Sequence, residues 1–440
     1  MRDLKVLWFT NMMMPEFSER LGIRKSVIGG WMPSLAEAVK KYAPQIELCI
    51  ASEGPIQTAI RIGGIEYVSL GMAKRNRKIF PSLRHIRSEF KSAVVNCVKA
   101  FKPDVIHIHG SEGYFPTLSH DCWCGIPCAV SLQGIIAGYA PHYMGNITEQ
   151  EFKPFRNIVR EILQGYSTSN EAAYWRNNRG VKEINALKSF RYIFGRTAWD
   201  KAWTKYINPD ACYLEVGEVL RPEFYQQRRK PHEIVSHTIY CGAAATYPLK
   251  GAHWILRALA VLKKKYPDVK LIIARAPLIS SSINFFQARR LGEYHRYLRS
   301  LISSLDLWGN VELLDGLAAD AVADVLRRSE VFCLPSLVEN SPNSLGEAML
   351  MGVPAIATDV GGVKSILSDG NEGILVPSAD PASIADSIDM LFSNRSLAIQ
   401  YADAAYKTAV NRYNPQIVVQ QLLAAYESMT SNEKSRPCNV

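Results

Sequence analysis

The sequence predicts an α/β protein made of two doubly wound domains, each with a mostly parallel sheet covered by helices on both faces. Two observations lead to this fold class. Short apolar runs rich in β-branched residues alternate with longer helical segments along the chain, as βαβ units require. The length of 440 residues exceeds what a single hydrophobic core usually organises. A polar stretch at 225–233 interrupts the alternation, and we place the domain boundary at residue 228.

The first domain, residues 1–228, contains six short apolar runs that predict buried strands. Helices are expected in most of the gaps between them. The long polar and aromatic stretch at 148–188 is expected to form helices inserted between two strands. The predicted strands are 5–10, 46–52, 65–71, 104–110, 128–134 and 191–197.

The second domain, residues 229–430, repeats this pattern with six further strands. A final helical stretch from about 414 is a candidate to pack back on the first domain. Residues 431–440 are polar, and we expect a disordered tail there. The predicted strands are 238–243, 269–275, 311–316, 331–336, 353–359 and 373–378.

The composition, with 48% hydrophobic and 21% charged residues, is that of a globular protein. No apolar stretch is long enough to span a bilayer, and the first residues lack the features of a secretory signal. Nine scattered cysteines argue against a disulfide framework and for a reducing compartment. We therefore expect a cytoplasmic protein, with peripheral attachment to the inner face of the membrane left open.

The net charge of +10 is concentrated in the first half, where Lys and Arg outnumber Asp and Glu by 11 in residues 1–230. Its densest part is KRNRKIFPSLRHIRSEFK at 74–91, where basic and apolar residues are interleaved. Two interpretations stay open for this segment: contact with an anionic membrane surface, or a solvated helix face whose apolar residues enter the core. No nucleic-acid-binding motif accompanies the charge, so nucleic acid is not an expected partner.

The stretch LVENSPNSLGEAMLMGVPAIATDVGG at 337–362 predicts a loop, a helix and a strand. Ser341 is the expected N-cap, Pro342 suits the first helical position, and Gly352 followed by Pro354 ends the helix. The stretch follows a predicted strand, and ligands of open α/β sheets bind beyond the carboxyl ends of strands. We therefore expect a binding site at the start of this helix.

Five residues of this stretch carry the expected chemistry. The amides of Asn343, Ser344 and Leu345 would face a phosphate at the helix N-terminus. Glu339 and Glu347 flank that position with seven residues between them, and carboxylates are good acceptors for sugar hydroxyls. A phosphate flanked by polyols is a nucleotide sugar.

The dipeptides at 335–336 and 342–343, together with EAMLMGVPAIATDVGG at 347–362, resemble the E-x7-E signature of glycosyltransferase family 4. The similarity extends over the second half, with LKGAHWILRALAVLKKKYPDVKLIIA at 249–274 in the expected place. It implies the GT-B fold, in which two Rossmann-like domains face each other across a cleft. It also implies that the donor binds mainly to the second domain and that transfer retains the anomeric configuration.

The resemblance also assigns roles to individual residues. It implies that Glu339 binds the transferred sugar and Glu347 the nucleotide ribose, and that Lys250 neutralises the donor diphosphate. Glu339 and Lys250 are thereby the implied catalytic residues. The remaining donor-binding assignments are Asn343, Ser344 and Leu345 at the phosphates, Gly316 beside the base, and Gly29 and Gly30 in a glycine-rich loop near the phosphates.

Two departures from the family pattern stand out. Many members have an arginine after the glycine of the first strand of the second domain, whereas Gly242 is followed by Ala243; Arg275 is a candidate replacement. A polar residue near the reacting sugar is commonly histidine, and Gln133 aligns there. The other acceptor-side candidates are His109, which strand alternation places on the same side of the sheet as His107, and Arg196, for which folding support is the equal alternative.

The expected function is retaining transfer of a sugar from a nucleotide-diphosphate sugar to a glycan or lipid-linked glycan, in cell-surface polysaccharide synthesis. No Asp-x-Asp triplet occurs in the chain, and we expect neither a metal nor another cofactor. Two alternatives stay open. A GT-B-like nucleotide-sugar epimerase uses a similar frame without an acceptor, and a non-catalytic nucleotide-sugar-binding scaffold would need no turnover.

Overall fold

The computed structural model describes residues 3–23, 30–71, 88–156, 167–226, 228–242, 244–274, 291–314 and 316–434. The chain divides into two compact units. The first comprises residues 1–137, 176–219 and 412–440, and the second comprises 138–175 and 220–411. The division differs from the predicted ranges in two places: an arm at 138–175 belongs to the second unit, and the boundary lies at 219/220 and not at 228/229. The chain from 412 onward belongs to the first unit, which agrees with the expectation that the helix from about 414 packs back on it.

The first unit is built on an eight-stranded sheet with the order β3-β4-β2-β1-β5-β6-β7-β8. All neighbouring strands are parallel except β3, which runs antiparallel to β4. The six predicted strands are present with small changes at their ends, and the sequence missed β3 and β8. The bounds are β1 Leu4–Thr10, β2 Ile46–Ser52, β3 Gln57–Ile62, β4 Ile65–Leu70, β5 Val105–His109, β6 Cys128–Ser131, β7 Tyr192–Gly195 and β8 Cys212–Glu215.

Successive residues of β1 enter two different cores, one on each face of this sheet. Val6 and Trp8 lie in one core with residues of α2 and α18, and Leu7 and Phe9 lie in the other with residues of α3 and α8. This alternation is what a strand buried on both faces requires. The helices of this unit are α1 Pro15–Arg20, α2 Trp31–Tyr42, α3 Ser88–Phe101, α8 Gly180–Leu187, α9 Ala198–Ile207 and α18 Pro415–Lys434.

The second unit has a six-stranded, fully parallel sheet with the order β11-β10-β9-β12-β13-β14. Counted along the chain, this is the doubly wound order 3-2-1-4-5-6 of Rossmann folds. All six predicted strands are present, each shorter than expected. The bounds are β9 Thr238–Tyr240, β10 Lys270–Ile273, β11 Val311–Leu313, β12 Val331–Leu334, β13 Ala355–Thr358 and β14 Gly373–Val376.

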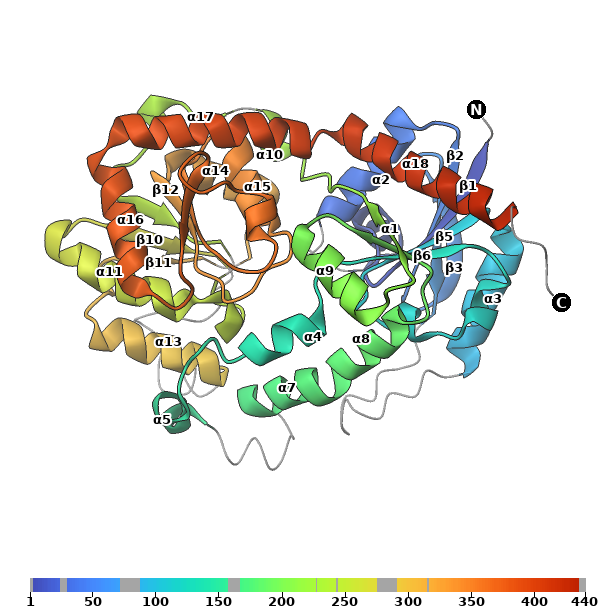
Figure 1. The fold of residues 1–440 in the computed structure, drawn as a ribbon, viewed down its shortest axis with the longest axis horizontal. Helices are drawn as coiled ribbons and strands as arrows, with labels where there is room; N and C mark the ends of the chain where they lie inside the picture. The colour runs from blue at the N-terminus through green and yellow to red at the C-terminus, as the bar shows by residue number, and fades with distance from the viewer. Residues whose placement is uncertain are drawn as a thin grey trace. The chain divides into compact units, whose positions relative to one another are not determined.

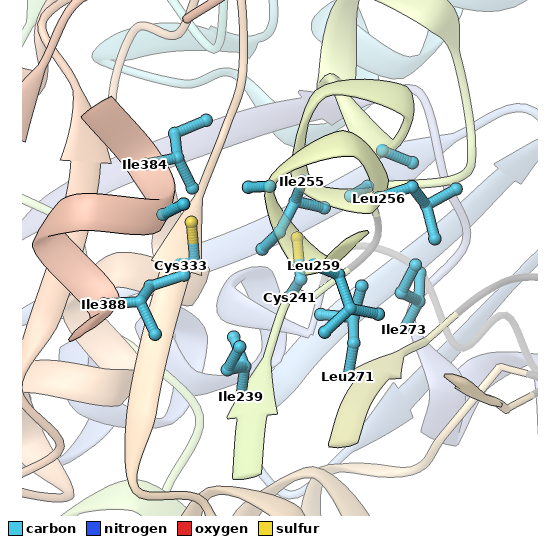
Figure 2. Close-up of a cluster of buried hydrophobic side chains, with 14 of the residues drawn as sticks. Ile239, Cys241, Ile255, Leu256, Leu259, Leu271, Ile273, Cys333, Ile384 and Ile388 are labelled. Carbon is cyan, nitrogen blue, oxygen red and sulfur yellow. The ribbon is translucent and has the colours of Figure 1, made fainter. Parts of the chain in front are cut away.

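The core of the second unit fills the space between this sheet and helices α11 and α16. Figure 2 shows Ile239 and Leu271 from the strands meeting Ile255 from α11 and Ile384 from α16, and all four side chains are buried. The helices of this unit include α10 Glu223–Gln226, α11 Ala252–Lys265, α13 Glu293–Ser304, α14 Ala319–Arg328, α15 Asn343–Leu350, α16 Pro381–Ser393 and α17 Arg395–Arg412, whose last residue already belongs to the first unit.

The arm at 138–175 leaves after β6 and is fastened to the second unit by hydrogen bonds. The Gly145 carbonyl accepts bonds from His253 Nε2 at 2.8 Å and from Trp254 Nε1 at 3.0 Å. The Thr168 amide donates to Glu293 Oε2 at 2.7 Å. As predicted, this region forms helices between two strands; they are α4 Ile136–Tyr139, α5 Glu149–Phe152 and α7 Thr168–Tyr174, followed by α8 (Figure 1).

Some predictions fall on parts of the chain outside the described residues. These are Gly29, Arg275 and the basic segment up to residue 87. In the predicted tail, residues 431–434 still belong to α18, so its helix signal extends further than the polar composition suggested. Across the described ranges, no helix combines the length and the apolar composition that crossing a bilayer demands.

Candidate active site

The candidate site lies where the strand order of the second unit reverses, at the carboxyl ends of β9 and β12. Loops from these two neighbouring strands diverge to opposite faces of the sheet, which leaves a place for a ligand between them. The loops approach closely there: a Cβ on Gly242, which follows β9, would lie 3.6 Å from Cβ of Ser344 at the start of α15. The topology therefore brings the loop that carries Lys250 beside the E-x7-E stretch.

Backbone contacts fix the Lys250 loop against the stretch that follows β12. The Leu337 amide donates to the Leu249 carbonyl at 2.8 Å. Gly251 has φ +78°, and a Cβ at this position would lie 2.0 Å from the Pro335 carbonyl oxygen. Only glycine combines this left-handed backbone with so close an approach. The glycine of the Lys-Gly pair is thus explained by packing within the unit.

Glu339 is buried and oriented by several contacts. Its Oε1 accepts hydrogen bonds from Lys250 Nζ at 2.6 Å and from Ser336 Oγ at 2.7 Å. Its carbonyl accepts from the Gly362 amide at 2.9 Å, and a Cβ on Gly361, where φ is +52°, would come within 1.9 Å of the same oxygen. The glycine pair that ends the motif therefore holds the backbone of Glu339, and the structure brings the two implied catalytic residues together.

Helix α15 begins one residue later than the sequence predicted. Its N-cap is Pro342, in extended conformation, so the expected Ser341 cap is wrong; the Ser341 hydroxyl makes no hydrogen bond within the described residues. The Pro342 carbonyl accepts from the Leu345 amide at 3.1 Å, which removes that amide from the predicted anion site. The amides of Asn343 and Ser344 head the helix, where backbone donors have no intrahelical partner.

Glu347 lies one turn into α15 and is buried among apolar residues of the helix. Its Oε1 accepts from Arg221 Nε at 2.9 Å and Nη2 at 2.8 Å, and the side chains are 7% and 22% exposed. The Arg221 guanidinium also lies 4.8 Å from the centre of the Phe224 ring. Sequence reasoning missed Arg221, because an arginine between an apolar run and a proline carries no motif.

In the first unit, His107 and His109 point to the same side of the sheet, as strand alternation predicted, with ring centres 3.8 Å apart. His107 is hydrogen-bonded to the hydroxyls of Tyr426 and Ser131 at 2.7 and 2.6 Å. Burial, with a smaller effect of Arg196, lowers the pKa of His107 to about 3. Burial also holds the pKa of His109 well below its usual range, and neither ring nitrogen of His109 has a hydrogen-bond partner within the described ranges.

Arg196 is part of the packing of the first unit. Its guanidinium bonds Glu218 Oε2 at 2.6 Å and the Leu132 carbonyl at 2.5 Å, and its amide donates to Asp200. These contacts favour the folding role over acceptor contact. The other predicted residues lie as follows: Gln133 is half-buried two residues after β6, Gly30 is the N-cap of α2, and Gly316 is exposed after β11.

A buried carboxyl group near the end of β5 was also missed. Glu183 of α8 accepts from Ser111 Oγ at 2.6 Å and from the Ala137 amide at 3.2 Å. Burial raises its pKa to about 7, and the neighbouring Glu112 adds to the shift. The sequence offered no signal for this pair, because the two glutamates are 71 positions apart and meet only in the fold.

The family described as glycosyl transferases group 1 matches residues 226–408. This span is similar to that family, and we call it the group 1 domain. A phosphatidyl-myo-inositol mannosyltransferase of Mycobacterium leprae is 31% identical over 186 residues, which is 42% of this chain and 45% of that protein. The match thus spans less than half the length of that relative.

Solved structures resemble nearly the whole chain. Sucrose-phosphate synthase of Thermosynechococcus elongatus has a TM-score of 0.65 at 13% identity, over 98% of this chain and 100% of that one. HepE of Anabaena, solved in complex with UDP, has a TM-score of 0.64 at 15% identity, over 97% and 100%. At sequence identities of 13% and 15%, the similarity shows a shared fold and nothing about function. It confirms the predicted GT-B fold, in which the group 1 domain is the second of two Rossmann-like units.

Proposed function

We propose that this protein is a retaining glycosyltransferase that moves a sugar from a nucleotide-diphosphate sugar to a glycan or lipid-linked glycan acceptor, in cell-surface polysaccharide synthesis. The observation that carries the proposal is the meeting of Lys250, Glu339 and the start of α15 at the switch point of the group 1 domain. UDP in the complex of the similarly folded HepE supports a nucleotide-sugar donor, and the M. leprae mannosyltransferase supports a lipid-linked acceptor.

In this proposal the diphosphate lies at the head of α15. The amides of Asn343 and Ser344 donate to it, and the helix dipole adds about 0.3–1 kcal/mol. Lys250 has three N–H donors; one donates to Glu339, and the others donate to the phosphates. When the bond between sugar and diphosphate breaks, negative charge builds on the leaving group, and these fixed donors stabilise it. Because they supply the positive charge, the reaction needs no metal.

The two glutamates accept hydrogen bonds from the polyol parts of the donor. Glu339, held by Ser336 and by the glycine pair, accepts from hydroxyls of the transferred sugar. Glu347 accepts from the ribose, in a position that Arg221 now occupies. The proposal assigns Gly316 to the base and Gly30 to the phosphates, together with Gly29, which lies outside the described residues. His109 and Gln133 serve the acceptor side.

The first test is thermal stabilisation by UDP-, GDP- and ADP-sugars, measured on the wild type and on Glu347→Ala. A matched control is Glu312→Ala, which removes an exposed glutamate of the same unit that pairs with Arg328. A ligand at about 100 times its dissociation constant should stabilise by about 2.7 kcal/mol. We expect one nucleotide class to stabilise the wild type and Glu312→Ala but not Glu347→Ala. Absence of stabilisation by every nucleotide sugar would overturn the donor site.

Turnover then separates the proposed transferase from its two alternatives. Incubation with the stabilising donor and acceptor extracts should give a glycosylated product with the donor's anomeric configuration. An altered nucleotide sugar formed without any acceptor would identify an epimerase instead. Donor binding without any turnover would identify the scaffold.

A further inference from the structure

The turn that carries Lys250 is held on both sides by one glycine of the arm. This turn is a short 3₁₀ helix, Pro248–Lys250, that leads into α11. After the turn, His253 Nε2 and Trp254 Nε1 donate to the Gly145 carbonyl at 2.8 and 3.0 Å. Before Lys250 the contact is tighter: a Cβ on Gly145, where φ is +64°, would lie 2.3 Å from the Pro248 carbonyl oxygen. Gly145 therefore contacts the chain on either side of Lys250.

Two aromatic rings of the arm pack on the residue that starts this turn. Tyr247 is the N-cap of the turn, and its carbonyl accepts from the Lys250 amide at 3.0 Å. The Tyr247 ring centre lies 6.0 Å from those of Tyr143 and Trp175, which are 5.0 Å apart. Since tilted and edge-to-face rings attract each other, three rings in mutual contact fix one another. The rings therefore hold the start of the turn, as Gly145 holds its end.

The arm can act as a support, because its own side chains enter the core of the second unit. Ile147 and Phe152 are 7% and 2% exposed and belong to the cluster that α11 and the sheet form. Glu151, in the capping box that starts α5, accepts from Arg257 Nη2 of α11 at 2.6 Å. Burial and hydrogen bonds thus fasten the arm to the helix that follows the Lys250 turn.

We propose that Gly145, Tyr143 and Trp175 are positioning residues, which place the Lys250 ammonium for the donor diphosphate through the turn 248–250. The ammonium ends a long flexible chain, so where it lies depends on how its backbone is held. A displacement of about 1 Å at a reacting group can lower a rate about 100-fold. The three residues touch neither donor nor acceptor.

This inference rests on the proposed function for the chemistry of Lys250, but the contacts that carry it are independent of that function. All three positioning residues lie outside 226–408, the span that matches the glycosyl transferases group 1 family. The chain inserts them between β6 and β7 of the first sheet. Residues far from the family match in the sequence therefore hold the cation of the donor site.

The first test compares Gly145→Ala with Gly370→Ala, a glycine of the second unit at φ +68° with open space around it. Gly145→Ala forces the Pro248 carbonyl to move, whereas Gly370→Ala carries only the strain of a left-handed residue. In the unliganded full chain, Lys250 is labelled with acetic anhydride and quantified by peptide mass spectrometry. In Gly145→Ala, loss of its bond to Glu339 should raise the labelling rate about tenfold. Gly370→Ala should leave the rate unchanged.

A milder variant decides the question if Gly145→Ala fails to fold. Trp254→Phe removes one N–H donor to the Gly145 carbonyl and keeps an aromatic ring. Its matched control is Trp308→Phe: that indole donates to Ser303 Oγ at 2.9 Å, and an arginine guanidinium lies over each of the two rings. Loss of a neutral hydrogen bond corresponds to about 2- to 12-fold. We expect Trp254→Phe to raise the Lys250 labelling rate and lower kcat by about that factor, and Trp308→Phe to change neither.

Kinetics then separate positioning from a general weakening of the fold. Gly145→Ala should lower kcat and kcat/KM equally, by about 100-fold, as loss of a transition-state contact does. In the Lys250→Ala background the same substitution should cause no further loss, because residues that act through one group are not additive. An equal further loss in that background would overturn the inference.

Unchanged labelling of Lys250 in the arm variant and in Trp254→Phe would also overturn the positioning role, whatever the kinetics show. Labelling requires neither donor nor acceptor, so faster labelling supports the role even if no nucleotide sugar is turned over. Turnover by the wild type together with unchanged labelling would keep the proposed function and remove this inference alone.

Discussion

The two units present the same topological position with different chemistry. At the carboxyl edge of the second sheet, charged side chains meet: Lys250 with Glu339, and Arg221 with Glu347. In the first unit, β5 at the switch point carries two buried histidines that are neutral because burial lowers their pKa. They pack against aromatic rings, and the ring centres of His109 and Trp8 are 4.6 Å apart. One fold thus supports two ion pairs with partly exposed cations in one unit, and buried neutral histidines, one of which is bonded to hydroxyl groups, in the other. The loops that follow the strands, rather than the sheets themselves, determine which unit can bind an anion.

The largest effect should come from removing the cation of the charged site. Lys250→Ala deletes the donor proposed to stabilise the leaving diphosphate and leaves the buried Glu339 carboxylate without it. Loss of one such donor typically lowers kcat by about 10²–10³. Initial rates of transfer and of donor hydrolysis would be compared with Lys264→Ala, an exposed lysine on α11 of the same unit. Equal rates for both variants would remove Lys250 from the mechanism.

A backbone clash should perturb the same site without touching a charged group. Gly251→Ala places a methyl 2.0 Å from the Pro335 carbonyl, whereas Gly370→Ala, at a similar φ of +68°, has open space around it. Both variants carry the strain of a left-handed residue, about 1–2 kcal/mol. The extra cost of Gly251→Ala should be about 1–3 kcal/mol, as for other overpacked sites. Denaturant unfolding of the two variants measures that difference, and equal values would mean that the loops adapt.

The neutral network should behave in the opposite way, contributing stability and leaving donor binding intact. Tyr426→Phe removes the hydroxyl that accepts from Trp8 Nε1 at 2.8 Å and bonds His107 Nδ1. Leaving such buried groups unpaired costs about 1–3 kcal/mol. Tyr206→Phe, at an exposed ring, is the control and should be neutral. A loss of donor affinity in Tyr426→Phe without a loss of stability would contradict this division of roles.

The smallest effect, within any single pH unit, is a pH dependence confined to the first unit. Since burial raises the pKa of Glu183 from 4.5 to about 7, the folded protein binds a proton that the unfolded chain has already released in this range. Stability from this group is therefore complete below about pH 4.5 and declines as pH rises through about 7, by at most about 1.4 kcal/mol per pH unit. Glu183→Gln should flatten that decline in unfolding curves, and Glu215→Gln at the end of β8 should not. A decline that persists in Glu183→Gln would assign it to other groups.

Whether a strand could be predicted from the sequence depended on how deeply its residues are buried. Strands covered on both faces, such as β1, read as continuous apolar runs and were found. Strand β3 alternates between exposed and half-buried residues at the sheet edge, and β8 is short and only half-buried. Neither forms the continuous apolar run that was used to identify strands. Residue patterns could therefore predict the interior of each sheet but not its edges.

For the candidate site, the sequence predicted residues whose position follows from local motifs. Glu339 and Glu347 were predicted from their place around the start of a helix, and Lys250 from the resemblance to the family; the structure brings Lys250 and Glu339 together. Arg221 was missed, because its pairing with Glu347 joins positions 126 apart. The cap at Ser341 was wrong because Pro342 keeps an extended backbone and takes the capping position itself. Contacts between loops that are far apart in the chain leave no local pattern in the sequence, so residue patterns could not predict them.

The arm at 138–175 limits how the chain can be divided. The chain passes from one unit to the other at 137/138, 175/176, 219/220 and 411/412. A fragment cut to residues 226–408, the span of the family match, would lack Gly145, whose carbonyl accepts from His253 and Trp254. His253 Nε2 and Trp254 Nε1, on α11 one turn beyond Lys250, would then lose this acceptor, although His253 Nδ1 would keep its bond to the Tyr294 hydroxyl. Chimeras that exchange donor specificity with a relative must therefore carry the arm with the second unit, joined at all four crossings.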